Sequence, residues 1–526
     1  MISFNKYVIL LKIQIFIAGA SIMSLEIMNS RILAPYFGSS LYVWGSLIGV
    51  VLSGLSIGYY YGGRKADLNP KYSYFCVILL GAGLYSILTT FGSTTIFSFV
   101  LSANLGERFS PLLASTLILG VPSILLGMVS PYAIKLTTKK IEIIGKATGN
   151  LYSVSTLGSI FGTFLTTFYL IPEASLTANL YGVSIVLIAT SLFGLTLMIK
   201  PFAVLSIFIC VLLIFTPQSN SFGIVEKRDT LYHRLIVTDD NLSSIRTLIL
   251  DNNFHSAMDL KDTDRVVYLY TGLFHLGFAY NPDIIDVLFI GGGGFSGPKR
   301  FLQDYSNVKI DVVEIDPDVI DISKIYFNVS EDPRMNIYVN DGRVFLRTTD
   351  QIYDLIVLDA YGKTYVPFHL MTKEFHQLIS DHLSDNGVLV FNIITSLDGS
   401  ASELFKAELK TMKEIYPIVD IYQVSNISSD LFVQNVIIIA HKNVNSLSNQ
   451  ELIANSQNII SAINTEEIIK KRYTENLDLS DSIIITDDYA PVMDLLNPVT
   501  GKLLIKEIIV NNGTISKIEN VTQPII

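Results

Sequence analysis

The sequence predicts a multi-span α-helical membrane domain that is followed by a nucleotide-binding α/β domain. Three observations support this prediction. First, 50% of the 526 residues are hydrophobic and the mean hydropathy is +0.46, which is too apolar for a chain that folds entirely in water. Second, long apolar runs fill the N-terminal part of the chain, about Tyr7 to Pro217. Third, short strand-like segments alternate with helix-like segments in the part that follows, and a glycine-rich turn lies among them.

Residues 1–217 form the predicted membrane domain. Its apolar runs each approach the roughly 20 residues that span a hydrocarbon core, and soluble helices rarely run this long with so few charges. Because several runs follow one another, we expect the first to stay in the chain rather than to be removed as a signal peptide. The runs are Val8–Leu25, Val43–Tyr61, Tyr74–Thr90, Leu112–Ile134, Leu151–Ile171 and Leu176–Ile199.

Two short basic loops bear on the orientation of this domain. One contains Arg64 and Lys65 and the other Lys139 and Lys140; they lie two spans apart, and the positive-inside bias places both in the cytoplasm. A further apolar stretch, Phe202–Phe215, is short for a span. If it crosses the membrane, the following domain lies outside the cell; if it lies in the interface, that domain is cytoplasmic.

Charge and cysteine usage argue against two kinds of site. The formal net charge is −10 and the pI is about 5.3, and no basic block occurs in the second half of the chain, so we expect no nucleic-acid partner. Cys76 and Cys210 lie far apart within apolar runs, which excludes a disulfide framework and a metal-ligand spacing. We expect no metal, because the histidines considered also lack such a spacing; these are His255, His275, His369 and His376.

The rest of the chain is predicted to contain three parts: a small β-rich module at 218–282, an α/β domain at 283–445 and a C-terminal extension at 446–526. The stretch Asn443–Asn458 is polar and typical of a linker. In the α/β domain, alternating strands and helices predict βαβ crossovers and a largely parallel sheet covered on both faces. The predicted strands are Val287–Ile290, Ile310–Val313, Asn336–Val339, Leu355–Leu358 and Val388–Phe391.

The strongest local signal is a glycine-rich turn directly after the strand Val287–Ile290. Gly292, Gly294 and Gly297 fit the pattern G-x-G-x-x-G. Glycine suits this position because the backbone must turn tightly and approach a ligand without a Cβ in the way. The next strand ends in an acid, Glu314, roughly 20 residues on, where a carboxylate can accept hydrogen bonds from the hydroxyls of a ribose.

Two further strands end in acids, at Asp341-Gly342 and at Asp359. The carboxyl ends of parallel strands share one rim, and open α/β sheets bind ligands there. The alternative is that Asp341 and Asp359 are helix N-caps and that Glu314 is a solvated strand end. For one residue the two interpretations are about equally good, but together the four strand ends favour a ligand site.

Read in order, several motifs resemble the spermidine synthase family over about Tyr232 to Phe391. They are Leu288–Gly297, Val313-Glu314-Ile315-Asp316, Asp332-Pro333-Arg334, Asp341–Leu346, Tyr353–Asp359 and the pair Tyr232-His233. Other segments look like the membrane-fused branch of that family. They are Glu26–Gly38, Gly62–Asp67, Gly127–Pro131 and Thr486–Pro491.

The resemblance implies a Rossmann-like domain of the class I methyltransferase type. Such a domain holds decarboxylated S-adenosylmethionine while an amine attacks the carbon next to the sulfonium. By resemblance, Glu314 would bind the ribose, Asp341 the adenine amino group and the loop Gly291–Gly294 the sulfonium tail. The candidate catalytic residues are Asp359 and Tyr270, and the candidate cofactor-binding residues are His233, Gly291, Gly292, Gly293, Gly294, Glu314, Asp316, Asp341 and Gly342.

The sequence departs from the family pattern where the family has carboxylates. Gly294 stands at the position of an Asp that holds the aminopropyl ammonium. Gly362, followed by Lys363, replaces the second acid of the Asp-x-x-Asp segment that begins at Asp359, and His233 replaces a glutamine. Three hypotheses therefore stay open.

The first hypothesis is a transferase that moves an aminopropyl-type group to an amine, with Asp487 or Asp488 supplying further amine contacts. The second is a methyltransferase or aminocarboxypropyl transferase that uses S-adenosylmethionine itself, whose carboxylate would fit near the N–H groups of the glycine loop. NAD binding is a less favoured interpretation of that loop. Asp487, Asp488 and Tyr489 could also cap a helix that includes Met493–Leu496, which we slightly favour.

The third hypothesis is a nucleoside-sensing membrane protein or transporter without enzymatic activity. It rests on Glu26, Asn29 and Arg31, because ionisable groups within a span are costly and often mark a pathway. Pairing of Glu26 with Arg31, or a hydrogen bond between helices, is the favoured alternative. The expected partners are the lipid bilayer and a small-molecule amine, with a homodimer as a candidate assembly. We expect a multi-pass protein of the cell membrane with a cytoplasmic α/β domain, because adenosyl sulfoniums are cytoplasmic metabolites.

Overall fold

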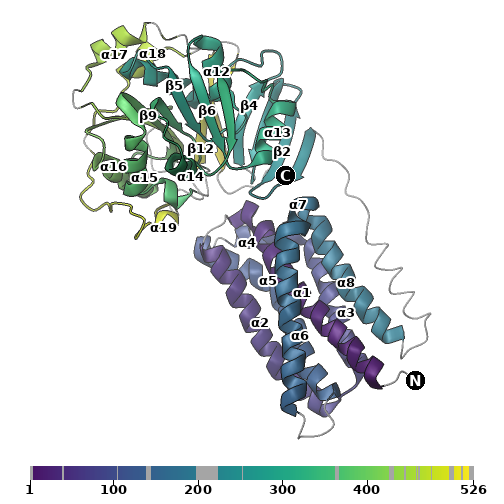
Figure 1. The fold of residues 1–526 in the computed structure, drawn as a ribbon. Helices are drawn as coiled ribbons and strands as arrows, with labels where there is room; N and C mark the ends of the chain where they lie inside the picture. Colours follow the sequence, from purple (N-terminus) through teal and green to yellow (C-terminus); the bar gives the residue numbers. More distant parts are fainter. Residues whose placement is uncertain are drawn as a thin grey trace. The chain divides into compact units, whose positions relative to one another are not determined.

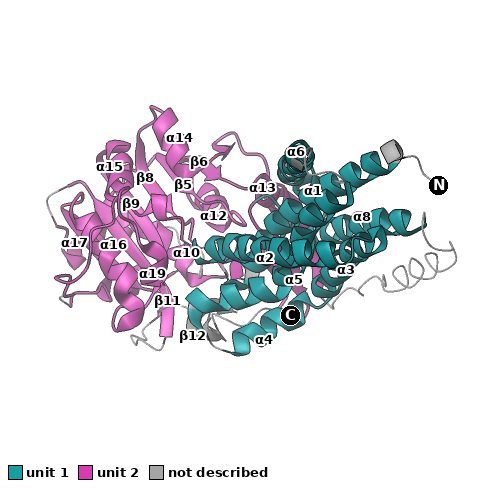
Figure 2. Ribbon diagram, turned by 90° about the horizontal axis from the view of Figure 1, so that it is seen from below, with its two compact units in different colours: residues 1–221, 229–231 teal, residues 222–228, 232–526 magenta. Residues whose placement is uncertain are grey.

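The computed structural model describes residues 4–37, 41–103, 105–137, 144–196, 223–251, 253–361, 366–425, 432–443, 446–457, 459, 463–475, 477–496, 503–510 and 513–520 (Figure 1). The chain divides into two compact units (Figure 2). Unit 1 comprises residues 1–221 and 229–231, and unit 2 comprises residues 222–228 and 232–526. The stretch Phe202–Phe215 and the residues Cys210, Gly362 and Lys363 lie outside the described residues.

Unit 1 is a bundle of helices. Among the described residues, six helical segments are long and apolar enough to cross a membrane. Each predicted apolar run lies within one of them, except that the last three residues of Leu176–Ile199 lie outside the described residues. This confirms the predicted multi-span helical class. The elements are α1 (Phe4–Phe37), α2 (Leu41–Leu68), α3 (Tyr72–Phe91), the shorter α4 (Ser93–Ser102), α5 (Gly106–Thr137), α6 (Ile144–Leu165), a π-helical turn (Thr166–Leu170), α7 (Ile171–Glu173) and α8 (Leu176–Thr196).

Glycines allow α2 and α5 to pack closely. Gly54, Gly58 and Gly62 recur every fourth residue on one face of α2 and are turned toward α5. A Cβ on Gly58 would lie 2.8 Å from the Cα of Gly127, and one on Gly62 would lie 2.7 Å from the Cα of Met128. Small residues at this spacing let helix backbones approach, which is how helices associate when no hydrophobic effect drives them together.

Polar side chains are buried inside unit 1. Tyr72 donates a hydrogen bond to Gln14 Oε1 at 2.8 Å, and Thr166 donates to Ser24 at 2.8 Å, so these groups satisfy one another between helices. Glu26 on α1 is only 9% exposed. Within the part of the chain that the structure describes, its carboxylate has no hydrogen-bond or ion-pair partner, so the favoured pairing with Arg31 is not found.

Unit 2 begins with a small antiparallel sheet in the order β1-β2-β3-β4. Strands β2 and β3 pair antiparallel, as do β3 and β4. Apolar side chains of this sheet, among them Leu235 and Leu248, pack against Ile322 and Phe327 of the following α/β layers. The strands are β1 (Ile224–Asp229), β2 (Arg234–Asp240), β3 (Ile245–Leu250) and β4 (Asn253–Asp259).

The main sheet has nine strands in the order β13-β12-β11-β9-β8-β5-β6-β7, with β10 paired to β11. Strands β7, β6, β5, β8 and β9 are parallel, and β11 joins β9 antiparallel. The largely parallel sheet of the predicted Rossmann-like class is thus confirmed, with an antiparallel addition. The strands are β5 (Asp286–Ile290), β6 (Lys309–Glu314), β7 (Met335–Val339), β8 (Tyr353–Leu358), β9 (Leu383–Thr395), β10 (Ile418–Gln423), β11 (Phe432–His441), β12 (Leu503–Val510) and β13 (Gly513–Asn520).

Helices cover both faces of this sheet. Alternate residues of β5 enter different cores: Leu288 and Ile290 pack with α14, α15 and α16, whereas Val287 and Phe289 pack with α12 and α13. The helices are α10 (Leu269–Gly272), α11 (Gly277–Tyr280), α12 (Ser296–Asp304), α13 (Pro317–Tyr326), α14 (Gly342–Thr348), α15 (Lys373–Asp381), α16 (Glu403–Lys413), α17 (Asn449–Ser456), α18 (Thr465–Lys470) and α19 (Val492–Leu496), with 3₁₀ turns at Leu273–Leu276, Phe368–Leu370 and Ser400–Ser402.

Part of the predicted linker Asn443–Asn458 is helical instead. Helix α17 begins after Ser448, whose hydroxyl accepts from the N–H of Glu451 while the Glu451 carboxylate accepts from the N–H of Ser448. This capping box is a sequence signature of a helix start, and it outweighs the polar composition of the stretch. Leu452 of α17 is fully buried.

The close packing of α2 on α5 leads to a prediction. Gly58→Leu should destabilise unit 1 by about 1–3 kcal/mol, because the new side chain has to displace the backbone of α5. The measurement is the thermal unfolding midpoint of the full chain in detergent. Gly49→Leu is the matched control, since it lies on the same helix and a Cβ there meets no atom within 4 Å. Equal midpoints for the two variants would contradict the proposed packing role.

Candidate functional site

The glycine-rich turn lies between β5 and α12, at the carboxyl edge of the sheet. Gly291 has φ +101° and Gly293 has φ +49°, conformations that residues with a side chain rarely adopt. A hydrogen bond of 2.9 Å joins the N–H of Gly291 to the carbonyl of Val313, and another of 2.9 Å joins the N–H of Asp359 to the carbonyl of Ile290. The turn is therefore tied to the ends of β6 and β8 on either side.

Glu314 ends β6 and lies against this turn. Its Oε2 accepts hydrogen bonds from the N–H groups of Gly292 at 2.9 Å and Gly293 at 3.2 Å, and its Oε1 accepts from the N–H of Asp316 at 3.0 Å. The residue is 9% exposed. Glu314 is thus not a solvated strand end, because three backbone N–H groups hold its carboxylate in one orientation.

Asp316 and His233 lie beside Glu314. Asp316 is fully buried and caps α13, with its side chain accepting from the N–H of Asp318 at 3.0 Å. His233, just before β2, contacts the Asp251 carboxylate through Nδ1 at 2.7 Å. Burial opposes the charged form of His233, but the hydrogen bond to Asp251 and the charges of Asp251, Asp316 and Glu314 outweigh it and raise the pKa of the imidazole. The small sheet therefore contributes a basic group next to the Glu314 rim.

Asp341 follows β7 and is the N-cap of α14. Its Oδ1 accepts from the N–H groups of Arg343 at 2.9 Å and Val344 at 3.0 Å. Its Oδ2 lies 2.9 Å from Nε2 of His369, and this bond, with the capping bonds, holds the pKa of the carboxyl below its usual range despite partial burial. Gly342 packs its backbone on the side chain of Ile290, where a Cβ would not fit.

Asp359 and Tyr270 form the part of the site assigned to catalysis by resemblance. Asn392 donates a hydrogen bond of 2.8 Å to Asp359 Oδ1, and Asn435 donates one of 3.0 Å to Asn392 in turn. Burial raises the pKa of Asp359 to about 6, although the Asn392 bond works in the opposite direction. Tyr270 donates to the carbonyl of His255 at 3.2 Å, and burial together with the nearby charge of Asp359 raises the pKa of its phenol.

Ser256 on β4 occupies the space beside Gly294. The N–H of Gly294 donates to Ser256 Oγ at 2.8 Å. A Cβ on Gly294 would lie 2.7 Å from the Cβ of Ser256 and 3.2 Å from the ring of Phe327, so a larger residue does not fit without a shift of β4. The structure thus supplies a hydroxyl at the place where the resemblance would put a carboxylate.

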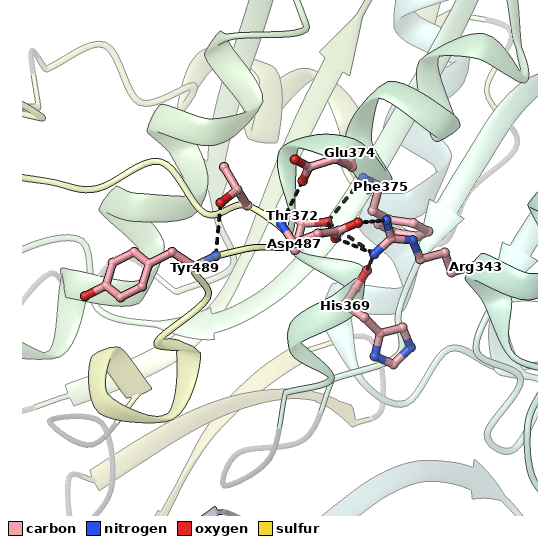
Figure 3. A network of polar contacts seen from close by, with 8 residues as sticks. Arg343, His369, Thr372, Glu374, Phe375, Asp487 and Tyr489 are labelled. Atoms are coloured by element: carbon pink, nitrogen blue, oxygen red, sulfur yellow. Dashed lines mark hydrogen bonds and ion pairs between the residues drawn. The ribbon is translucent and has the colours of Figure 1, made fainter.

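Asp487 takes part in a network with Arg343 and Thr372 (Figure 3). Arg343 contacts both of its carboxylate oxygens, at 2.7 and 2.5 Å, and Thr372 donates to Oδ1 at 2.7 Å. The preferred expectation that Asp487 caps the helix containing Met493–Leu496 is therefore wrong: α19 begins only at Val492, and the carboxylate is engaged by Arg343.

Sequence reasoning missed several residues of this site. His369 was considered only as a metal ligand and Arg343 only as part of the motif Asp341–Leu346, whereas Ser256 and Asn392 were not considered. Their partners are 28, 144, 38 and 33 residues away along the chain, respectively. No local motif could indicate these contacts, because the fold alone brings the partners together.

Comparison with known proteins matches residues 270–449 to a family model described as the spermine/spermidine synthase domain. A polyamine aminopropyltransferase of Alkaliphilus oremlandii is 36% identical over 171 residues, which are 32% of this chain and 60% of that protein. A polyamine aminopropyltransferase of Vibrio vulnificus is 34% identical over 155 residues, which are 29% of this chain and 50% of that protein. The chain thus spans between half and 60% of the length of these relatives.

Among solved structures, a probable spermidine synthase from Corynebacterium glutamicum is 18% identical, with a TM-score of 0.41, and the match covers 52% of this chain and 99% of that one. The segment that matches the family model, residues 270–449, contains Tyr270, the glycine-rich turn, Glu314, Asp341 and Asp359. Residues 270–449 of this chain are thus similar in sequence to the spermine/spermidine synthase domain.

Proposed function

We propose that the protein is a membrane-anchored transferase that binds an adenosyl sulfonium and moves an aminopropyl-type group from the sulfur to an amine. The observation that carries this proposal is the sheet rim, where Glu314 is held against the glycine-rich turn and Asp341 follows the neighbouring strand β7. The matched synthase domain and the relatives named polyamine aminopropyltransferases support the same class of reaction.

The two carboxylates keep capacity for a nucleoside. A carboxylate offers about four lone-pair sites. At Glu314, backbone N–H groups occupy three of these sites, two on Oε2 and one on Oε1. The second site of Oε1 can therefore still accept a hydrogen bond from a ribose hydroxyl. At Asp341 two N–H groups use Oδ1 and His369 uses one site of Oδ2, which leaves a site for the amino group of adenine.

The transfer itself needs proximity and a base. The amine attacks the carbon next to the sulfonium, a C–N bond forms, and the C–S bond breaks with its electron pair passing to sulfur, so that a neutral thioether leaves. The amine must then lose a proton. We assign this proton to Asp359, because a pKa of about 6 leaves the carboxylate ionised at neutral pH and makes it a better base than an ordinary aspartate. Tyr270 lies close enough for the Asp359 charge to act on it and would contact the amine.

We infer that the six long apolar helices anchor the protein in the cell membrane as a multi-pass domain. We place unit 2 in the cytoplasm, because adenosyl sulfoniums are made and used there. Reporter fusions behind Thr196 and behind Ile526 would test the orientation.

A second candidate uses S-adenosylmethionine itself, for methyl or aminocarboxypropyl transfer. The observation that favours it is Ser256, which fills the space beside Gly294 and leaves no carboxylate there for the ammonium of a decarboxylated tail. The methionine tail of S-adenosylmethionine carries its own carboxylate, to which the Ser256 hydroxyl can donate a hydrogen bond.

Binding of the nucleoside is the first test of the proposed function. Glu314→Ala should weaken the binding of methylthioadenosine and of both sulfonium forms roughly 10- to 100-fold, because the charge-assisted hydrogen bond from the ribose to Oε1 is lost. Calorimetric titration of the full chain in detergent measures this, with NAD as a competitor nucleotide. Glu331→Gln, an exposed acid between α13 and β7, is the control and should bind as the wild type does. If the wild type binds none of these ligands, the transferase assignment fails.

Asp359 should give the reaction a pH dependence. The rate with an amine acceptor should rise as the pH passes through about 6, because only the ionised carboxylate can take the proton. Asp359→Asn should lower the rate about 10²- to 10⁴-fold and should abolish the rise of the rate near pH 6. Initial rates measured from pH 5 to 8 would test both effects.

Asp359 should also make the stability of the protein depend on pH. A folded-state pKa raised from 3.8 to about 6 favours the protonated form, so this contribution to stability is fully present below about pH 4 and is lost as the pH rises through 6. The unfolding midpoint of the wild type should therefore fall across this range relative to that of Asp359→Asn. A wild-type profile that parallels that of the variant would rule out Asp359 as the titrating group.

The space beside Gly294 distinguishes the two candidate cosubstrates. Gly294→Asp alone should bind both sulfonium forms poorly, because its Cβ collides with Ser256. The double variant Ser256→Gly with Gly294→Asp removes the closest collision and leaves only the 3.2 Å approach to the Phe327 ring. It should shift the binding preference toward the decarboxylated form by about tenfold or more, since a carboxylate then faces the ammonium. Ser256→Gly alone is the control. A wild type that already prefers the decarboxylated form would exclude the second candidate.

A further inference from the structure

The segment that carries Asp487 is firmly attached to the α/β layers of unit 2. Ile485 is fully buried among the residues that pack under α15 and α16. Its carbonyl accepts a hydrogen bond of 2.8 Å from the N–H of Lys373, and its N–H donates one of 2.9 Å to the hydroxyl of Thr411. The segment lies outside the matched synthase domain, which ends at residue 449, so the domain alone does not account for it.

Asp487 holds two groups at once. Arg343 binds both carboxylate oxygens, and its side chain is 9% exposed, so Asp487 neutralises a cation that is nearly out of water. Thr372 donates to the same carboxylate while its own oxygen accepts from the N–H of Phe375 as the N-cap of α15. Both functions of the Thr372 hydroxyl are thereby used.

Arg343 extends this network to Asp341. Its guanidinium also donates to the carbonyl of His369 at 3.0 Å, and its backbone N–H donates to Asp341 Oδ1 at 2.9 Å. The ring of His369 in turn contacts Asp341 Oδ2 at 2.9 Å. Arg343 and His369 thus connect Asp487 to both oxygens of Asp341. Figure 3 shows the part of this network between Asp487 and His369.

We propose that Asp487 is a positioning residue of the adenosyl pocket, which sets the orientation of the Asp341 carboxylate and thereby the preference for a purine with a 6-amino group. This inference rests on the proposed function, in which Asp341 accepts from the adenine amino group. Without the Asp487 charge, Arg343 is left as a nearly buried cation without this partner and must shift toward water or another acceptor. The 3₁₀ turn Phe368–Leu370 then loses the hydrogen bond between Arg343 and the carbonyl of His369. The contacts of Ile485 still keep the segment around Asp487 attached.

The test compares two nucleosides that differ only in the 6-amino group, adenosine and purine riboside. Calorimetric titration of the full chain in detergent should give a wild-type preference for adenosine of about tenfold, the effect of one charge-assisted hydrogen bond. Asp487→Asn should lose most of this preference by weakening adenosine binding, while purine riboside binds as before. Asp341→Asn should show the same pattern, which identifies the group through which Asp487 acts.

Glu414→Gln is the matched control. It removes an ion pair of 3.0 Å with Lys373 on α15, in which both side chains are more than 40% exposed, and such pairs contribute little. Its preference for adenosine should equal that of the wild type. Arg343→Lys is the second variant: it keeps the positive charge but not the two-pronged contact with Asp487, and it should lose the preference as Asp487→Asn does.

The outcomes separate this inference from the proposed function. Failure of the wild type to bind any adenosyl compound would overturn the proposed function and this inference with it. A wild type that binds, with Asp487→Asn and Arg343→Lys keeping the preference for adenosine, would overturn only the role of Asp487. An equal loss of affinity for both nucleosides, with a lowered unfolding midpoint, would also overturn it, because Asp487 would then support the fold rather than position Asp341.

Discussion

The candidate site depends on the meeting of one carboxylate with one backbone turn. Glu314 accepts hydrogen bonds from the N–H groups of Gly292, Gly293 and Asp316. The two glycine N–H groups belong to a turn that adopts positive φ angles at Gly291 and Gly293. A buried carboxylate is costly unless it is hydrogen-bonded, and buried N–H groups need acceptors. The acid at the end of β6 and the turn after β5 therefore stabilise each other, and together they position the starts of α12 and α13.

Elements outside the parallel sheet complete this rim. The small sheet contributes His233 beside Glu314 and Ser256 beside Gly294. On the other side, the segment around Asp487 reaches Asp341 through Arg343. In the proposed function the central strands provide a general frame for the nucleoside, and the elements added before and after them supply the groups that would face its two ends. Specificity in this protein is accordingly expected to depend on residues that lie outside the strands themselves.

Much of the fold could be predicted from local patterns. Runs of about 20 apolar residues can be recognised as long enough to span a membrane without knowledge of the fold, and the alternation of strands and helices predicted the parallel sheet. The glycine-rich turn and Glu314 were recognisable because their spacing along the chain is nearly constant in such folds. The helix α17 was missed although its capping box, Ser448 with Glu451, is a local signal, because polar composition was given more weight.

What the sequence by itself determined is the division into apolar helices and an α/β part, the positions of the central parallel strands along the chain and the acids at their ends. Only the tertiary structure decided which groups meet those acids: Asn392 at Asp359, His369 at Asp341, Arg343 at Asp487 and Ser256 at Gly294. The physical reason is that strand and helix periods are local properties of the chain. The partner of a buried polar group, in contrast, is chosen by how distant segments pack, and it can lie 144 residues away, as Asp487 does from Arg343.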